Sequence, residues 1–152
     1  IEVIMRPIKT LEQETRVLNL YTRLMRATNT VTEKMHKPLQ CYKLSISQFG
    51  VLEALYHLGP LSQKDIGDKI LKTSGNITMV IDNLEKRDLV KRAKDPDDRR
   101  RLTITLTGLG QDLIKKIFPG HSKTALKIFS VLEPEEQHTL GLLLKKLGTR
   151  NK

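Results

Sequence analysis

The sequence is poor in the residues that cross-link a protein or anchor it in a membrane. It has one cysteine and no tryptophan among 152 residues. A single cysteine excludes a disulfide framework within the chain and is typical of a reducing compartment. The longest apolar clusters, such as residues 142–144, are far too short to span a bilayer, and no signal peptide is visible. We therefore expect a cytoplasmic protein with no membrane partner.

Recognisable catalytic and metal-binding motifs are missing as well. The four histidines are scattered along the chain, at His36, His57, His121 and His138. They stand too far apart for a local metal-ligand motif, and only one cysteine could join them. Gly108-Leu109-Gly110 lacks the third glycine of a dinucleotide-binding loop. We therefore predict a protein that is not an enzyme and that binds no metal or cofactor.

Positive charge, by contrast, is abundant. The chain has 27 lysines and arginines against 17 aspartates and glutamates, which gives a formal net charge of +10. The excess is spread along the whole chain and favours a polyanionic partner in general. A length of 152 residues is that of about one domain, so the motifs must locate the binding surface.

The most informative stretch is a predicted β-hairpin between residues 88 and 107. Two runs with strand character, residues 89–92 and 102–106, flank a loop of proline, aspartate and arginine. Burying three unpaired guanidinium groups would be prohibitive, so we expect exposed arginines at the tip, oriented by Asp98: Arg99, Arg100 and Arg101. Such a tip suits a phosphate backbone and the narrow groove beside it. The alternative is a solvated charged turn, because acids and bases mix there.

Two helices joined by a tight turn precede this hairpin. Ser62 and Asp65 form a variant of the N-terminal capping box, and Ser74 is a candidate cap for a second helix that runs to about Arg87. On the second helix, apolar residues recur at i, i+3, i+4 and i+7. This spacing predicts a continuous inward stripe: Ile77, Val80, Ile81 and Leu84.

The start and the outer faces of the second helix carry the small and amide side chains that a recognition helix uses. Asparagine offers a donor and an acceptor to adenine, threonine contacts a thymine methyl or a phosphate, and glycine permits close approach of the backbone. The candidate DNA-binding residues are Ser74, Gly75, Asn76, Thr78, Met79 and Asn83. Helix, turn, helix and two-stranded wing make a winged helix-turn-helix, with a plain helical hairpin beside a β-hairpin as the alternative.

Several segments together resemble one known family. Residues 44–55 (LSISQFGVLEAL), 59–61 (GPL) and 77–92 (ITMVIDNLEKRDLVKR) precede the wing sequence DPDDRR at 95–100, which Leu-Thr at 106–107 and a glycine at 110 follow. In this order and spacing they resemble the MarR family of bacterial transcriptional regulators. One departure is Asp88, where many relatives have glycine. Aspartate tolerates the left-handed backbone better than most residues do.

The resemblance implies a homodimeric repressor that binds double-stranded DNA at a pseudo-palindromic operator. It also implies an effector site between the dimer-forming helices and the winged domain, suited to a small aromatic or phenolic molecule. Its candidate lining is Tyr21, Met25, His36 and Phe49, and plain core packing is the alternative for each. Some relatives sense oxidants through a thiol near the start of their first helix, but Cys41 lies past Pro38, so that mechanism cannot be carried over. An inert or packed thiol and a redox-sensing repressor are the two alternatives for Cys41. An effector-free architectural DNA-binding protein and a protein-binding winged helix are further hypotheses for the protein.

The predicted fold is mainly α with a small β-hairpin wing, in three parts. Residues 1–44 hold a dimerisation helix that Pro38 stops, residues 45–107 the winged helix-turn-helix, and residues 108–152 the C-terminal dimerisation helices. We expect caps at Ser45 with Gln48, at Thr107 and at Pro134, an end at Gly59-Pro60, and a break or strong kink at Pro119. Apolar stripes left over at both chain ends are most simply explained by a shared dimer interface.

Overall fold

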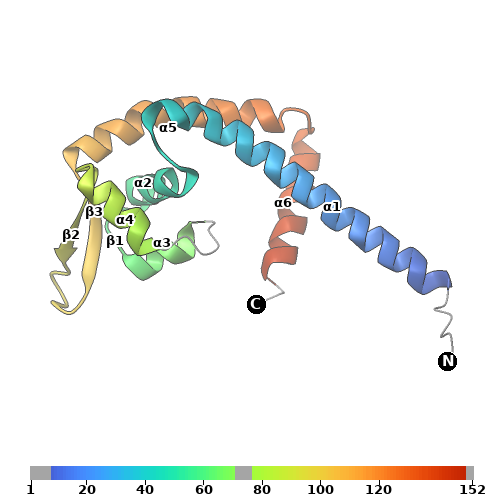
Figure 1. Cartoon of the computed structure of the whole chain (residues 1–152), viewed down its shortest axis with the longest axis horizontal. Helices are drawn as coiled ribbons and strands as arrows, with labels where there is room; N and C mark the ends of the chain where they lie inside the picture. Colours follow the sequence, from blue (N-terminus) through green and yellow to red (C-terminus); the bar gives the residue numbers. More distant parts are fainter. Residues whose placement is uncertain (1–7, 71–76, 150–152) are drawn as a thin grey trace. The chain divides into compact units, whose positions relative to one another are not determined.

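The computed structural model describes residues 8–70 and 77–149 and divides into two compact units, Ile1–Lys34 and Met35–Lys152 (Figure 1). Most of the described chain is helical, as predicted. The elements in order are α1 (Ile8–His36), the 3-10 helix η1 (Lys37–Tyr42), α2 (Ile46–Leu58), β1 (Leu61–Ser62), α3 (Gln63–Lys69), α4 (Ile77–Lys86), β2 (Val90–Lys94), β3 (Leu102–Leu106), α5 (Gly108–Phe129) and α6 (Pro134–Thr149).

The described part of the first unit, residues 8–34, belongs to α1, which leaves most of its large apolar side chains exposed. Pro38 ends this helix as predicted, because proline lacks the N–H that the next turn would need. The chain continues instead as the tighter η1, with the proline in its first turn. Exposed along α1 are Leu11, Val17, Leu18, Leu20, Tyr21 and Met25.

Most of the predicted helix ends in the second unit are confirmed. At α2, the Gln48 backbone N–H donates to Ser45 Oγ at 3.1 Å, and the Ser45 N–H donates to Gln48 Oε1 at 2.9 Å. Gly59 ends this helix with a φ of 78°, a left-handed value that suits glycine. Ser62 caps α3 and Thr107 caps α5. Local capping chemistry therefore sets these boundaries.

The sheet has three antiparallel strands in the order β1-β3-β2. The sequence predicts only two, because β1 is two residues long and leaves no alternating pattern. Leu61 of β1 pairs with Ile104, and Ser62 pairs with Thr103. The first wing strand, predicted at residues 89–92, begins one residue later and ends two residues later, at Lys94. Beyond the short β1, the hairpin is an arm of two strands.

The apolar core of the second unit is built by residues between Leu39 and Ile117, and within it α2 contacts α3, α4, β3 and α5 (Figure 1). The inward stripe predicted for α4 is confirmed. Ile81 and Leu84 have no exposed surface, and Ile77 and Val80 pack against the core. The buried residues are Leu39, Leu44, Phe49, Val51, Leu52, Leu55, Ile66, Ile81, Leu84, Leu89, Val90, Ile104, Ile114 and Ile117.

The base of the wing is a close backbone contact. Asp88 adopts the left-handed conformation expected of it, with a φ of 56°. Thr107 donates a hydrogen bond from its hydroxyl to the Asp88 carbonyl at 2.5 Å. A Cβ on Gly110 would lie 2.0 Å from the carbonyl oxygen of Leu89. Only glycine therefore lets the start of α5 approach the chain between α4 and β2.

The break predicted at Pro119 is wrong, because α5 continues as one helix from Gly108 to Phe129. Proline removes one helical hydrogen bond, which leaves the Lys115 carbonyl without its partner. Both residues are exposed, so water can satisfy that carbonyl. Ile114 and Ile117 are buried in the core just before the proline and hold the helix in place.

The last helix, α6, starts at Pro134 as predicted and has no buried side chain over its described length. Its apolar stripe is therefore exposed: Leu140, Leu143, Leu144 and Leu147. No helix in residues 8–70 and 77–149 is both long and apolar enough to cross a bilayer.

Candidate nucleic-acid interface

The exposed side of α4 carries the described candidates of the recognition helix. Thr78, Met79 and Asn83 all point away from the core, and Met79 is 59% exposed. The other three candidates, Ser74, Gly75 and Asn76, lie outside the described residues. The helix thus buries one face and presents another with methyl, hydroxyl and amide groups, which are the groups that contact base edges.

A side-chain hydrogen bond links α3 to the start of α4. Gln63 Nε2 donates to Thr78 Oγ1 at 2.6 Å. The Thr78 hydroxyl accepts this bond, so its own proton remains available to an acceptor such as a phosphate oxygen. Gln63 gives no signal of this role in the sequence, because it lies fifteen residues from its partner.

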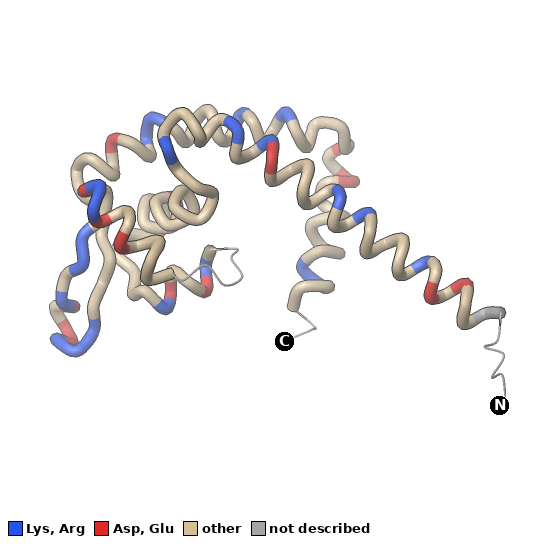
Figure 2. Tube along the Cα trace, viewed as in Figure 1, with Lys and Arg blue, Asp and Glu red and all other residues tan. Residues whose placement is uncertain are grey.

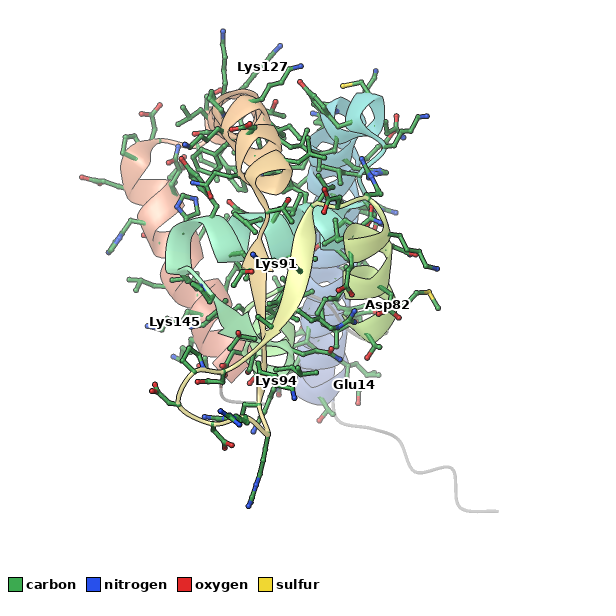
Figure 3. The ribbon with its side chains drawn as sticks, turned by 90° about the vertical axis from the view of Figure 1, so that its left-hand side faces the viewer. Glu14, Asp82, Lys91, Lys94, Lys127 and Lys145 are labelled. Carbon is green, nitrogen blue, oxygen red and sulfur yellow. The ribbon has the colours of Figure 1, made fainter. Side chains whose placement is uncertain are left out.

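Arg92 of β2 bridges two carboxylates of α4. Its guanidinium donates to Asp82 Oδ1 at 2.5 Å and also to Glu85 Oε2 (Asp82 is labelled in Figure 3). Burial alone would lower the pKa of Arg92, but the hydrogen bonds and charges of the two acids outweigh it and raise that pKa. No sequence pattern marks this cluster, because only the fold of the hairpin brings its members together.

Arg87 fixes the other end of α4. Its guanidinium donates to the carbonyl oxygen of Lys43 at 2.7 Å and to that of Tyr42 at 3.0 Å. These carbonyls end η1, where the backbone turns left-handed at Lys43 with a φ of 53°. Carbonyls at a helix end carry partial negative charge and attract a cation. Through Gln63, Arg87 and Arg92, α4 is thus tied to three neighbouring segments.

The loop of the wing is held by backbone bonds and leaves its arginine side chains exposed. The Asp95 N–H donates to the Arg101 carbonyl at 2.9 Å, and the Arg101 N–H donates to the Asp98 carbonyl at 2.9 Å. Two carboxylates tighten the turn: Asp95 accepts from the Asp97 N–H at 2.8 Å, and Asp98 accepts from the Arg100 N–H at 2.9 Å. These are Asx turns, which the Asp-rich sequence favours.

The expected role of Asp98 therefore needs correction. Its carboxylate shapes the loop through a backbone N–H, because a short side chain reaches the amide two residues ahead more easily than it reaches a guanidinium. Arg99, Arg100 and Arg101 are all exposed, and within the described chain their guanidinium groups have no hydrogen-bond or ion-pair partner. Figure 2 shows the basic positions that follow the hairpin out to this tip.

An open cavity of about 410 Å³ lies beside the winged core. Phe49, one of the predicted effector residues, lines it, and its ring centroid is 4.2 Å from that of His121. Glu53, His57 and Lys69 add a carboxylate, a second imidazole and an ammonium group. Desolvation lowers the pKa of His121, while Glu53 opposes the shift. The sequence does not indicate that His57 and His121 share a cavity, because α2 and α5 meet only in the folded chain.

The other effector candidates do not line this cavity. Tyr21 and Met25 are exposed on the first unit, and His36 is half-buried at the end of α1. A site that they share with Phe49 stays a prediction. Cys41 is exposed in η1, and its thiol donates to the Pro38 carbonyl at 2.9 Å. Within the described residues, no group of three His, Cys, Asp or Glu could hold a metal ion.

Known proteins are similar to this chain in both sequence and fold. Residues 44–102 match the model of the MarR family. The chain is 39% identical to an uncharacterized HTH-type transcriptional regulator, YkoM of Bacillus subtilis, over 90% of this chain and 89% of that protein. It is 38% identical to the HTH-type transcriptional regulator MhqR of the same organism, over 89% and 93%.

A solved structure of BpsR from Bordetella bronchiseptica superimposes with a TM-score of 0.76 at 29% identity, and covers 84% of this chain and 91% of that one. That structure concerns the regulation of its DNA binding by 6-hydroxynicotinic acid. These relatives are transcriptional regulators rather than enzymes, in agreement with the prediction. The chain therefore belongs to the MarR family, as a winged-helix transcriptional regulator that binds DNA.

Proposed function

We propose that the protein is a repressor that binds a pseudo-palindromic operator as a homodimer and releases it when a small aromatic or phenolic molecule binds. The observation that carries the DNA-binding mode is the wing tip. Its three exposed arginines have no partner within the described residues, and backbone bonds hold the loop that presents them. Such guanidinium groups suit the negative potential of a narrow minor groove.

On the operator, α4 enters the major groove and the wing reaches the adjoining minor groove. Thr78, Met79 and Asn83 face the base edges, and Ser74, Gly75 and Asn76, which precede α4 in the sequence, are proposed contacts as well. Two such helices must lie about 34–36 Å apart to occupy successive turns of B-DNA. A two-fold dimer meets this requirement, and it explains why the operator is expected to be pseudo-palindromic.

The dimer is supported by the exposed apolar rows of α1 and α6. Leu18, Leu20 and Tyr21 are each more than 60% exposed on α1, and α6 exposes its leucines along one stripe. Such patches are rare on monomers, and burying them between two copies removes them from water. The terminal helices of residues 1–44 and 108–152 are therefore the proposed dimerisation region.

The effector is supported by the cavity beside Phe49 and by the molecule named with the Bordetella relative. The cavity offers aromatic faces, imidazoles and one ammonium group, which together suit an aromatic ring with a hydroxyl or carboxylate. 6-Hydroxynicotinic acid is such a molecule. A ligand shifts the equilibrium only by its differential affinity for the two forms, so a tenfold loss of operator affinity needs about 1.4 kcal/mol of coupling.

The proposal is tested by footprinting the purified protein on its own upstream region, followed by titration of phenols, quinones and aromatic carboxylates. We expect protection of two half-sites about one helical turn apart and release of DNA by at least one class of aromatic compound. Asn76→Ala and Thr78→Ala should reduce discrimination between operator and random DNA more than affinity for random DNA.

Three outcomes would replace parts of this proposal. DNA binding that no compound changes, but that mild oxidant abolishes only when Cys41 is present, would favour the thiol-sensing repressor. Operator protection that responds to neither treatment would favour an architectural protein without an effector. The absence of any protection would favour a winged helix that binds proteins.

A further inference from the structure

The cluster of Arg92, Asp82 and Glu85 lies where the wing leaves the recognition helix. Asp82 and Glu85 are three residues apart on α4, so they share one side of that helix. Arg92 reaches both from β2, with Asp82 Oδ1 at 2.5 Å. In the sheet, Arg92 pairs with Ile104 of β3, which has no exposed surface and lies on the same face. One end of this bridge is therefore anchored in the core.

From this arrangement we propose that Arg92 is a positioning residue, which holds the wing against α4 so that helix and wing engage DNA as one unit. The inference rests on the proposed binding mode and adds a residue that is not expected to touch DNA itself. Without the bridge, the wing would lose its orientation, and α4 would be left with two uncompensated carboxylates.

The geometry of the hairpin explains why a bridge is needed at this point. The third strand, β1, pairs only with Ile104 and Thr103, the partners of Arg92 and Ala93. Beyond this row the wing is a two-stranded arm, and an isolated two-stranded hairpin is only marginally stable. Arg92 lies at the root of the arm, where a small rotation produces a larger displacement of Arg100 at the tip.

Charge gives Arg92 a second effect on DNA binding. Thr78, Asp82 and Glu85 follow one another at i, i+4 and i+7, so the two acids continue the flank of α4 on which Thr78 lies. Unpaired carboxylates on that flank would repel phosphates. Arg92 supplies the positive charge that opposes this repulsion.

The exposure of the cluster predicts where its effect appears. The side chains of Arg92, Asp82 and Glu85 retain 22%, 46% and 40% of their exposure, and ion pairs of this kind contribute little to folding. The effect should therefore be on operator affinity, with folding largely unchanged. A lysine cannot replace the arginine fully, because two different nitrogens of the planar guanidinium bond the two acids.

The first test is operator binding by the full chain as a function of salt concentration. We expect Arg92→Ala to weaken binding about tenfold or more, an effect as large as that of one specific contact. The slope of log affinity against log salt should fall no further than it does for Arg100→Ala, because Arg92 itself contacts no phosphate and only the contacts of the displaced wing are lost. Arg92→Lys should recover part of the affinity. The matched control is Lys91→Ala, which removes the same charge from the next residue of β2 and should leave the wing in place.

The second test is whether the wing and the helix remain coupled. Arg100→Ala should cost clearly less affinity in the Arg92→Ala background than in the wild type, because the wing is already displaced. The triple variant Asp82→Asn, Glu85→Gln and Arg92→Ala removes the repulsion without restoring the bridge, so it should recover only part of the affinity. The unfolding midpoint of each variant shows that it is folded.

Several results would overturn the inference. They are wild-type affinity for Arg92→Ala, a salt slope lowered further by Arg92→Ala when Arg100 is already alanine, independent effects of Arg92 and Arg100, or full recovery in the triple variant. Failure of the proposed function looks different. In that case Arg100→Ala has no effect in the wild-type background, whatever the Arg92 variants do.

Discussion

The winged region buries its apolar side chains, whereas the terminal helices leave theirs exposed. Every buried residue of the described chain lies between Leu39 and Ile117, in the segment that contains the winged fold. Neither α1 nor α6 buries a described side chain, although both carry apolar stripes. The winged region thus contains enough apolar contact to specify its own packing. The terminal helices need a second surface, and in our proposal that surface is another copy of the chain.

The largest effect is expected from a charge placed in the α6 stripe. Leu144→Glu should shift the protein from dimer to monomer, because a buried carboxylate without a partner is costly. Linking two half-site contacts in a dimer raises affinity by about 100-fold or more, so operator binding should fall by at least that factor. Sedimentation at micromolar concentration and operator titration measure the two effects.

The control for this variant is Lys145→Glu, a charge change on the opposite side of the same helix. It should leave the association state unchanged. A stable, folded monomer formed by the wild-type protein would contradict the contrast between the two regions.

A second prediction concerns the close packing of the winged region. Gly110→Ala should lower the free energy of unfolding by about 1–3 kcal/mol, at the upper end of that range, because its Cβ would meet the rigid Leu89 backbone. Gly108→Ala, two residues earlier in the same helix, has nothing within 4 Å and should be neutral or slightly stabilising. Denaturant unfolding of both variants measures the difference. Equal effects would refute the close contact.

The wing tip provides a third prediction. Arg100→Ala should weaken operator binding by about 1–3 kcal/mol while leaving stability unchanged, since the side chain is exposed. Lys127→Ala, on the exposed surface of α5 (labelled in Figure 3), removes the same charge away from the wing and should have a smaller effect. If both variants bind the operator as the wild type does, the wing is not a specific DNA contact.

The smallest effect is expected from pH. Burial lowers the pKa of His121 below its ordinary value of 6.5. Between these two values, the unfolded chain binds a proton that the folded protein does not, so stability falls as pH drops below 6.5 and is fully present above it. His121→Gln should flatten this dependence. Denaturant unfolding at about pH 8 and about pH 5 tests it, and an unchanged pH dependence in the variant would show that other groups cause it.

Local signals made much of the winged region predictable. Capping residues such as Ser45, Ser62 and Thr107 mark helix starts because each satisfies backbone N–H groups within three residues. The spacing of Ile77, Val80, Ile81 and Leu84 predicts which side of α4 is buried. The prediction at Pro119 failed because local chemistry favours a break there, whereas core contacts of the preceding turns favour continuity.

The candidate site was predictable only where its residues are consecutive or follow the spacing of a single helix. Arg99, Arg100 and Arg101 stand together in the sequence, and their exposure follows from the cost of burying unpaired charge. The Gln63–Thr78 bond, the Arg92 bridge and the Phe49–His121 contact join residues 7 to 72 positions apart, with no periodic pattern between them. The role of Asp98 was misjudged for a related reason, since its nearest donor is a backbone N–H.

By itself, the sequence determined most of the elements of this protein, their caps, the buried side of α4 and the basic character of the wing. These features depend on interactions within one helical turn or one strand, and on the cost of placing charge in an apolar core. Only the tertiary structure decided which side chains support the DNA-binding surface and which line the cavity. These depend on the packing of α4 against β2 and of α2 against α5. Contacts between segments that are distant in the chain produce no periodic or local sequence pattern from which they could be predicted.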